Sequence, residues 1–329
     1  MSLRAIDPTC RRALIFTPME TDRRILVEAA VLADQLGYET VMVPEGWGLD
    51  ASVVLAEIAT RTERVRLASG VLSIWGRSPA TLAMTAATLD DLSGGRFTIG
   101  LGTSTATLAE RFHGVAFARP AGRLRQVATG VRTLLDGDRI ATASGDPGLR
   151  LGYRPRARVP IWIAGLGPKA VAVATEVGDG WIPALVPRDR LDQARCRAIE
   201  AAAGDPELIS GPMAGPATAT VTSRHAAQQL VGWYLTGMGP FYGDLVAASG
   251  FGAEIEAIRA ANPKPRPGAV VWPSDADPLL AQLAVHGGPS EVASQIASWD
   301  RLADVVSICV GPGPVESVLA LVAAAAPSR

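Results

Sequence analysis

The segment with the clearest chemical meaning is Gly165-Leu166-Gly167-Pro168, which follows a short apolar run and precedes a helical pattern. Glycines let the backbone approach an anion, and a proline at the first helical position gives up no needed hydrogen bond. The free N–H groups and the dipole of the following helix favour negative charge, and Lys169 adds a positive charge. The segment predicts a phosphate site, although its composition also suits a tight strand-to-helix turn.

Two further glycine-containing segments lie at the ends of expected strands, Ser69-Gly70-Val71 and Gly102-Thr103-Ser104. A glycine within a strand typically marks a bulge or a place where the backbone meets a ligand. A flat ring could rest on Gly70, and the hydroxyls of the second segment could donate hydrogen bonds to a heteroaromatic edge. Barrel-corner glycines without a ligand explain both segments equally well.

Three side chains are candidates for catalysis, Glu45, Trp47 and His113. Glu45 follows an expected strand, and partial burial beside Trp47 would suit its carboxyl group to proton transfer. A helix cap or an ion pair is the alternative role for such an acid, and Asp50, directly before a helical pattern, is expected to be a cap. His113, between Phe112 and Gly114, is either a contact for a cofactor phosphate or substrate, or a surface-loop side chain.

Several other kinds of site are not expected. The three histidines are widely separated and form no HxH or HExxH pattern, so we expect no metal centre. Cys10, Cys196 and Cys309 form no CxxC pair, which argues against a disulfide framework and fits a reducing cytoplasm. Because no GxSxG motif occurs, hydrolysis through a covalent intermediate has no support. Redox chemistry remains open.

Composition limits the partners. Lys and Arg number 31 against 32 Asp and Glu, so the basic stripe of a nucleic-acid-binding protein is missing and a small-molecule substrate is favoured. The longest apolar stretch, residues 318–326, is far shorter than the roughly 20 residues that span a bilayer, so no membrane association is expected. The first apolar run, residues 13–16, is too short for a signal peptide, which favours a cytoplasmic location.

The elements that must position these residues alternate between short apolar runs and amphipathic stretches. This alternation, with glycines after several helical patterns, is typical of βαβ units. Strands are expected within residues 13–16, 40–43, 65–73, 97–101, 161–164, 180–183, 213–221 and 305–310. Helices are expected over residues 22–36, 51–62, 79–92, 119–135, from 168 onward, 188–203, 289–302 and 318–326. Eight units predict an α/β fold, a (β/α)8 TIM barrel, as a single domain over residues 1–329.

Two stretches interrupt this alternation and are expected to be insertions, after the fourth and the seventh strand. Residues 136–159 are polar and rich in glycine, whereas residues 223–261 suggest a pair of helices around Gly237-Met238-Gly239-Pro240. The alternative fold is an open doubly wound sheet. It is disfavoured because a first-turn GxGxxG with a downstream acid is missing. In a barrel the site is built at the carboxyl ends of the strands, where the candidate residues fall.

Taken together, these motifs resemble the luciferase-like monooxygenase superfamily. The resemblance is carried by residues 67–71, 78–83, 89–97, 100–102, 160–168 and 178–181. It covers nearly the whole chain and is weakest from about residue 210 to residue 278. Residues 45–51, with 102–104 and 112–115, are similar to the branch of the superfamily that uses the deazaflavin coenzyme F420.

This resemblance implies a cofactor site and a reaction. In the branch, a non-proline cis peptide in the third strand backs the deazaflavin ring, and here it would fall at Gly70-Val71. The loop before the fifth helix binds the cofactor phosphate. The implied cofactor contacts are Ser69, Gly70, Val71, Gly102, Thr103, Ser104, Gly165, Leu166, Gly167, Pro168 and Lys169. The implied reaction is hydride transfer between reduced coenzyme F420 and a C=C or C=N bond of a small molecule. We also expect a homodimer.

Two departures from the family pattern limit this inference. Many relatives have a histidine after the acid of strand two, whereas Gly46 and Trp47 follow Glu45 here. Thr103-Ser104-Thr105 stands where sugar-phosphate dehydrogenases of the family have a catalytic glutamate, so that activity is not expected. The alternatives are an FMN-dependent monooxygenase on the same fold and a non-catalytic cofactor-binding barrel. In the variable region, four aromatic residues are either pocket-lining or core and dimer contacts: Trp233, Tyr234, Phe241 and Tyr242.

Overall fold

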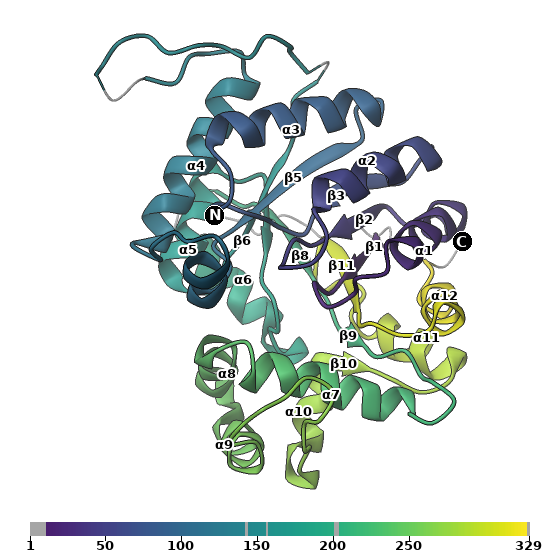
Figure 1. The fold of residues 1–329 in the computed structure, drawn as a ribbon. Coiled ribbons are helices and arrows are strands. Elements are labelled where there is room, and N and C mark those ends of the chain that lie inside the picture. Colours follow the sequence, from purple (N-terminus) through teal and green to yellow (C-terminus); the bar gives the residue numbers. More distant parts are fainter. Residues whose placement is uncertain (1–10, 142–143, 156, 201–203, 328–329) are drawn as a thin grey trace.

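Eight parallel strands close into a barrel in the computed structural model, which describes residues 11–141, 144–155, 157–200 and 204–327. The barrel strands are β1 (Arg12–Phe16), β2 (Thr40–Val43), β3 (Arg66–Ser69), β5 (Phe97–Gly102), β6 (Ile161–Ala164), β7 (Gly180–Ile182), β8 (Glu207–Ser210) and β11 (Val305–Val310). Each pairs with the next in this order, and the pairing of β1 with β11 closes the ring (Figure 1). The expected (β/α)8 barrel is confirmed.

Three short strands extend this sheet. They are β4 (Leu72–Ser73), which pairs with β5, β9 (Met213–Ala214), which pairs with β11, and β10 (Ala284–Val285), which pairs with β9. The α-helices are α1 (Arg23–Leu36), α2 (Ala51–Arg61), α3 (Pro79–Leu92), α4 (Pro120–Leu135), α5 (Pro168–Val177), α6 (Leu191–Glu200), α7 (Ser223–Thr236), α8 (Pro240–Val246), α9 (Gly252–Ala261), α10 (Asp277–Leu283), α11 (Pro289–Ala297) and α12 (Val315–Ala324). Short π-helical segments occupy Leu108–Phe112 and Ala247–Phe251, and 3-10 turns occupy Arg188–Arg190 and Ser274–Ala276.

Alternating side chains of the strands divide the apolar residues between two layers. One set points into the barrel and forms a small central core of Ala13, Met42, Ala68, Trp162, Ile209 and Val305. The other set, with Leu14, Val41 and Leu67 among its members, packs against the surrounding helices. A strand buried on both faces needs apolar residues at every position, which explains the unbroken apolar runs in the sequence.

The first three helices begin at side chains that accept hydrogen bonds from exposed backbone N–H groups. Asp22 accepts from the N–H of Arg24, Asp50 from that of Ser52, and Ser78 from that of Thr81. The expectation that Asp50 caps a helix is confirmed. Such caps satisfy N–H groups that have no partner inside the helix, and each contributes about 1 kcal/mol.

Two expectations about the second half of the chain require correction. The seventh strand was expected within residues 213–221, but the barrel strand β8 begins at Glu207, and only the short β9 lies in the expected range. The expected helix pair of residues 223–261 consists of three α-helices, α7, α8 and α9. Gly239, with φ of 91°, separates α7 from α8, and Gly250, with φ of 107°, lies before α9. Only glycine adopts such backbone angles readily, so each position interrupts the helical path of the chain.

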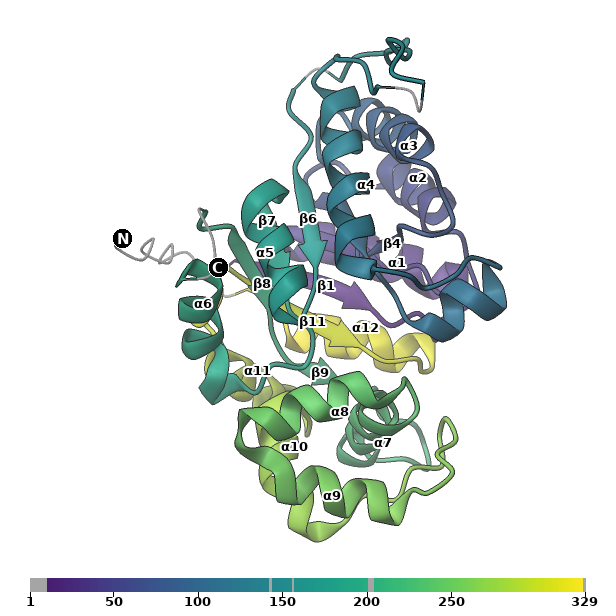
Figure 2. The ribbon, with the colours of Figure 1, turned by 90° about the vertical axis from the view of Figure 1, so that its left-hand side faces the viewer.

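The two insertions lie at opposite ends of the molecule (Figure 2). The helices α7, α8, α9 and α10 form a compact layer below the barrel in this view, whereas the loop between α4 and β6 projects at the top. The helical layer has its own apolar core, which includes Leu230, Ile255 and Leu279, and this core continues into Met213 of β9. Among the described residues, no helix combines the length and the apolar character needed to cross a membrane.

Candidate active site

The glycine-rich loop between β6 and α5 lies at the carboxyl end of the barrel. Gly167 is the N-cap of α5, and Pro168 occupies the first helical turn. No side chain caps this helix, and within the described residues the backbone N–H groups of Gly167 and Lys169 have no hydrogen-bond acceptor. An uncapped helix N-terminus with free N–H groups favours an anion. Lys169 is exposed beside it.

A tryptophan of the next strand holds this loop in place. The indole N–H of Trp181, in β7, donates to the carbonyl oxygen of Gly165 at 2.7 Å. A Cβ atom on Gly165 would lie only 2.6 Å from the Cβ of Ala170, so this position requires glycine for packing. A Cβ on Gly167 would meet only the ring of Phe241, at 3.7 Å, which is ordinary contact. Gly167 is therefore the glycine that faces the space open to a ligand.

The end of β3 is joined tightly to β5. The hydroxyl of Ser69 donates to the carbonyl of Gly100 at 2.9 Å and accepts from the N–H of Gly100 at 2.7 Å, and its side chain is buried. The peptide bond between Gly70 and Val71 is cis, at the position that the resemblance implied. A Cβ on Gly102 would lie 2.5 Å from Cγ2 of Val71. Gly102 thus lets β5 pack against Val71, while Ser69 makes its side-chain hydrogen bonds within the sheet.

The turn after β5 places two hydroxyl side chains at the same end of the barrel. Ser104 has φ of 52°, a left-handed conformation that is uncommon outside glycine and clusters at functional sites. The carbonyl oxygen of Thr103 accepts a 2.7 Å hydrogen bond from the indole N–H of Trp75. Trp75 in turn packs against Phe117, with ring centroids 5.4 Å apart. The turn is therefore held from the β4–α3 loop.

Glu45 is part of an ion-pair group at the mouth of the barrel. Its carboxylate accepts a hydrogen bond from the guanidinium of Arg77, which also reaches Asp50 at 2.9 Å. The hydrogen bond to Glu45 raises the pKa of Arg77. The backbone N–H of Glu45 donates to the carbonyl of Val71 at 3.3 Å, so Glu45 adjoins the cis peptide. The ion-pair role is thus present, and proton transfer by Glu45 stays a prediction.

The other two catalytic candidates differ in their surroundings. The ring of His113 packs on Gly76, where a Cβ would lie 2.8 Å from its Cε1 atom. Gly76 precedes Arg77, so His113 and Glu45 contact the same short segment between β4 and α3. Trp47 is 46% exposed on the loop before α2. The structure therefore brings Glu45 and His113 to one loop, with Trp47 at its rim.

Three positioning residues escaped the sequence analysis: Arg77, Trp75 and Trp181. Arg77 joins Glu45 to the cap of α2, and each tryptophan anchors a loop through its indole N–H. A partial signal exists, because a buried tryptophan needs an acceptor for its N–H group. The acceptors here are backbone carbonyl oxygens, which no side-chain pattern reveals.

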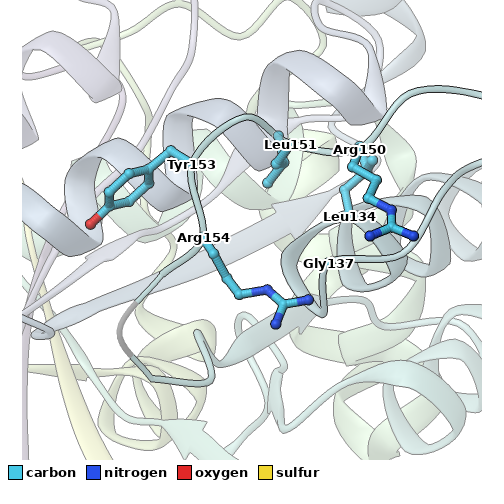
Figure 3. A pocket seen from close by; sticks show the side chains of 6 residues that line it. All are labelled: Leu134, Gly137, Arg150, Leu151, Tyr153 and Arg154. Atoms are coloured by element: carbon cyan, nitrogen blue, oxygen red, sulfur yellow. The ribbon is translucent and has the colours of Figure 1, made fainter.

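A cavity of about 330 Å³ lies elsewhere, beneath the insertion between α4 and β6. It is lined by Leu134, Gly137, Arg150, Leu151, Tyr153 and Arg154 (Figure 3). The insertion connects the end of α4 to the start of β6, so this cavity is at the amino ends of the strands. It is separate from the residues described above and contains none of the expected site residues.

Among the described residues, no three His, Cys, Asp or Glu side chains gather in a group that could hold a metal ion. Cys196 and Cys309 are free thiols, and Cys10 lies outside the described residues. The polar groups at the mouth of the barrel are thus backbone N–H groups, hydroxyls and the Glu45–Arg77 pair. Free backbone N–H groups and hydroxyls can donate hydrogen bonds to an organic anion.

Comparison with known proteins agrees with this arrangement. The model of the luciferase-like monooxygenase family matches residues 11–304. A Mycobacterium tuberculosis protein provisionally named a coenzyme F420-dependent oxidoreductase is 30% identical over an alignment of 331 positions, gaps included. The alignment covers 90% of this chain and 93% of the relative. The 5,10-methylenetetrahydromethanopterin reductase of Archaeoglobus fulgidus is 30% identical over 164 residues, which cover 48% of each chain.

A solved structure shows the same fold. The coenzyme F420-dependent tetrahydromethanopterin reductase of Methanopyrus kandleri superposes with a TM-score of 0.70 at 18% identity, covering 95% of this chain and 97% of that one. The chain therefore belongs to the luciferase-like monooxygenase family, and it is an oxidoreductase. The resemblance seen in the sequence is confirmed.

Proposed function

We propose that this protein is a coenzyme F420-dependent oxidoreductase that transfers hydride between the reduced deazaflavin and a C=C or C=N bond of a small molecule. The observation that carries the proposal is the uncapped N-terminus of α5, in a chain similar over 90% of its length to a relative named for coenzyme F420. That loop and the Gly70-Val71 peptide lie at the same end of the barrel.

The residues present fit such a cofactor. The free N–H groups of Gly167 and Lys169 would hold its phosphate, and the open space over Gly167 leaves room for it. The Gly70-Val71 peptide would back the ring, with Thr103 and Ser104 beside it. When bound, a deazaflavin supplies hydride transfer without activating oxygen. The chain itself orients the two reactants and leaves Glu45 and His113 near the mouth, where a proton is handled.

The alternative is an FMN-dependent monooxygenase on the same barrel. Titration of the purified protein with coenzyme F420 and with FMN, followed by cofactor fluorescence, separates the two. We expect quenching of the deazaflavin with saturable binding, and a much weaker response to FMN. Tight binding of FMN with no quenching of coenzyme F420 would overturn the proposal. A non-catalytic barrel predicts bound cofactor without hydride transfer to any acceptor.

We also propose that the protein is a cytoplasmic homodimer. The adjacent helices α2 and α3 each expose a large apolar side chain, Val53 at 65% and Met84 at 59%, and we propose this face for the contact with a second copy. Cys196 and Cys309 are free thiols, which suits a reducing compartment. Light scattering coupled to size-exclusion chromatography measures the mass, and a monomer at micromolar concentration would contradict the dimer.

A further inference from the structure

Two tyrosines of the helical insertion form a pair at the carboxyl end of the barrel. Tyr234 lies in α7 and Tyr242 in α8, with their rings edge to face and their centroids 5.7 Å apart. Tyr234 is only 8% exposed. Within the described part of the chain, neither hydroxyl has a hydrogen-bond partner, and neither is among the orphaned polar atoms that packing seals off completely. Both hydroxyls are therefore accessible and can donate hydrogen bonds to a ligand.

The pair is placed between the two parts of the proposed cofactor site. Cys309, at the end of β11, packs against the same cluster and lies beside Ile15 of β1 in the sheet. The Cδ1 atom of Ile15 is 3.0 Å from the position of a Cβ on Gly70. On the other side, Phe241 adjoins Tyr242 and lies against Gly167. Helix α8 thus spans from the phosphate loop toward the strand that borders the Gly70-Val71 peptide.

The side chains that pack around the pair in the core of the helical layer are apolar. Met213, Leu185 and Met19 pack in the same cluster. Burial raises the pKa of Cys309 to about 12 and raises the pKa of both tyrosines. All three are therefore neutral at physiological pH. A charged substrate group here would lose its hydration without gaining a counter-charge, which is costly.

We propose that Tyr234 and Tyr242 donate hydrogen bonds to the carbonyl oxygen of an uncharged, α,β-unsaturated carbonyl substrate. This inference rests on the proposed function and names the substrate class for it. The hydrogen bonds draw electron density from the C=C bond, so the β-carbon accepts the hydride and the π electrons move to the oxygen. Charge developing on that oxygen strengthens hydrogen bonds from positioned donors. The enolate then takes up a proton at its α-carbon, delivered by water or by the Glu45 carboxyl group proposed above, which gives the saturated carbonyl compound.

Binding of benzalacetone, an uncharged enone, to the protein without cofactor tests the proposal. The chain has four tyrosines, so a tyrosine far from the pair is present for a matched control with the same Tyr→Phe substitution. We expect the double variant Y234F/Y242F to bind benzalacetone about tenfold or more weakly, because each lost hydroxyl is a hydrogen-bond donor. We also expect loss of the red shift that hydrogen bonding gives the enone absorption. The matched control is Y153F, an exposed tyrosine at the far end of the barrel, and it should bind as the wild type does.

Several results would overturn the inference. They are unchanged affinity and spectrum in Y234F/Y242F, no binding of benzalacetone to the wild type, and equal or tighter binding of the anion cinnamate. Circular dichroism and thermal melting verify that the variants are folded, since each keeps its ring. Coenzyme F420 titration of the same variants is a separate readout. A wild type that binds the enone through both tyrosines but does not bind coenzyme F420 would refute the proposed function and leave the enone site standing.

Discussion

At the scale of single residues, the glycines of the site fall into two groups, according to whether there is room for a Cβ atom. Gly165 and Gly102 are required by the packing of the protein itself, because a Cβ at either position would lie within 2.6 Å of another side chain. Gly167 has an extended backbone, with φ of −79°, and room for a Cβ. No packing contact requires glycine at that position, although glycine suits the N-cap, and the open space beside it supports a ligand contact.

The first prediction follows from this division. Gly167→Ala should weaken binding of coenzyme F420 by about tenfold or more, because the methyl group occupies the space of the phosphate, a loss of about 1.4 kcal/mol or more. The melting temperature should stay within about 1 °C of the wild type, since surface substitutions without strain change stability little. Fluorescence titration and calorimetry measure the two quantities.

Gly165→Ala is the matched control. Its Cβ would collide with Ala170, so this variant should lose stability as well as affinity, by about 1–3 kcal/mol. If Gly167→Ala binds the cofactor as well as the wild type does, the phosphate site is wrongly placed.

Glu45 gives the second prediction. Glu45→Gln removes the negative charge next to Arg77 but keeps the shape of the side chain. If Glu45 handles the proton, turnover should fall by about a hundredfold or more, while affinity for coenzyme F420 changes by less than about threefold. Stopped-flow measurement of deazaflavin oxidation gives the rate. Arg77→Met is the comparison variant, and equal rates for Glu45→Gln and the wild type would leave Glu45 with the ion pair alone.

Residue types at strand ends thus predicted segments that the structure places together at the carboxyl end of the barrel, but not the contacts that each residue makes within the protein. The family resemblance implies Ser69 as a cofactor contact, and its hydroxyl also hydrogen-bonds to both backbone groups of Gly100. Arg77 lies 32 residues from Glu45, and no local pattern connects them. Such pairings form only when neighbouring strands bring their loops together, so they depend on tertiary structure.

At the scale of elements, the loops of the site are held by indole groups from neighbouring elements. Trp181 of β7 anchors the loop before α5, and Trp75 anchors the turn after β5. Loops that hold a ligand benefit from such support, because a fixed geometry avoids the entropy cost of ordering on binding.

A third prediction tests this support. Trp181→Phe keeps an aromatic ring but leaves the carbonyl of Gly165 without its donor. We expect a loss of about 1–2 kcal/mol in the free energy of unfolding and severalfold weaker binding of coenzyme F420. Trp75→Phe should cost similar stability, because it removes an equivalent hydrogen bond to Thr103. Urea denaturation and cofactor titration measure both, and unchanged affinity in Trp181→Phe would show that the loop needs no anchor.

The elements themselves were predictable where the chain follows the regular alternation and less so elsewhere. The first six strands and their helices agree with the apolar periodicity. The seventh strand was misplaced because Glu207 begins β8 with a charged side chain, which binds Arg11 at the amino end of the barrel. The helices of the insertion pack on each other as well as on the barrel, so their boundaries depend on Gly239 and Gly250.

At the scale of the whole molecule, the barrel is closed by contacts between the two ends of the chain. The first strand pairs with the last, from Arg12 opposite Val306 to Phe16 opposite Val310. Arg12 is 3% exposed, and its guanidinium reaches Asp300 at 3.0 Å and the carbonyl oxygens of Ala325 and Ala326 at 3.1 and 2.7 Å. One side chain thus ties β1 to the segment before β11 and to the end of α12.

The last prediction concerns this closure. Arg12→Met keeps much of the apolar stem but removes the hydrogen bonds that the guanidinium donates to Asp300 and to two backbone carbonyl oxygens, so the free energy of unfolding should fall by about 3 kcal/mol. The control is Arg125→Met, which removes an exposed ion pair with Glu176 and should cost less than about 0.5 kcal/mol. Urea denaturation followed by circular dichroism measures both variants. Pairing of the first strand with the last is a non-local contact and therefore slow to form. Because Arg12 supports this pairing, Arg12→Met should also slow refolding. Equal stability of the two variants would mean that the β1–β11 pairing closes the barrel without the help of Arg12.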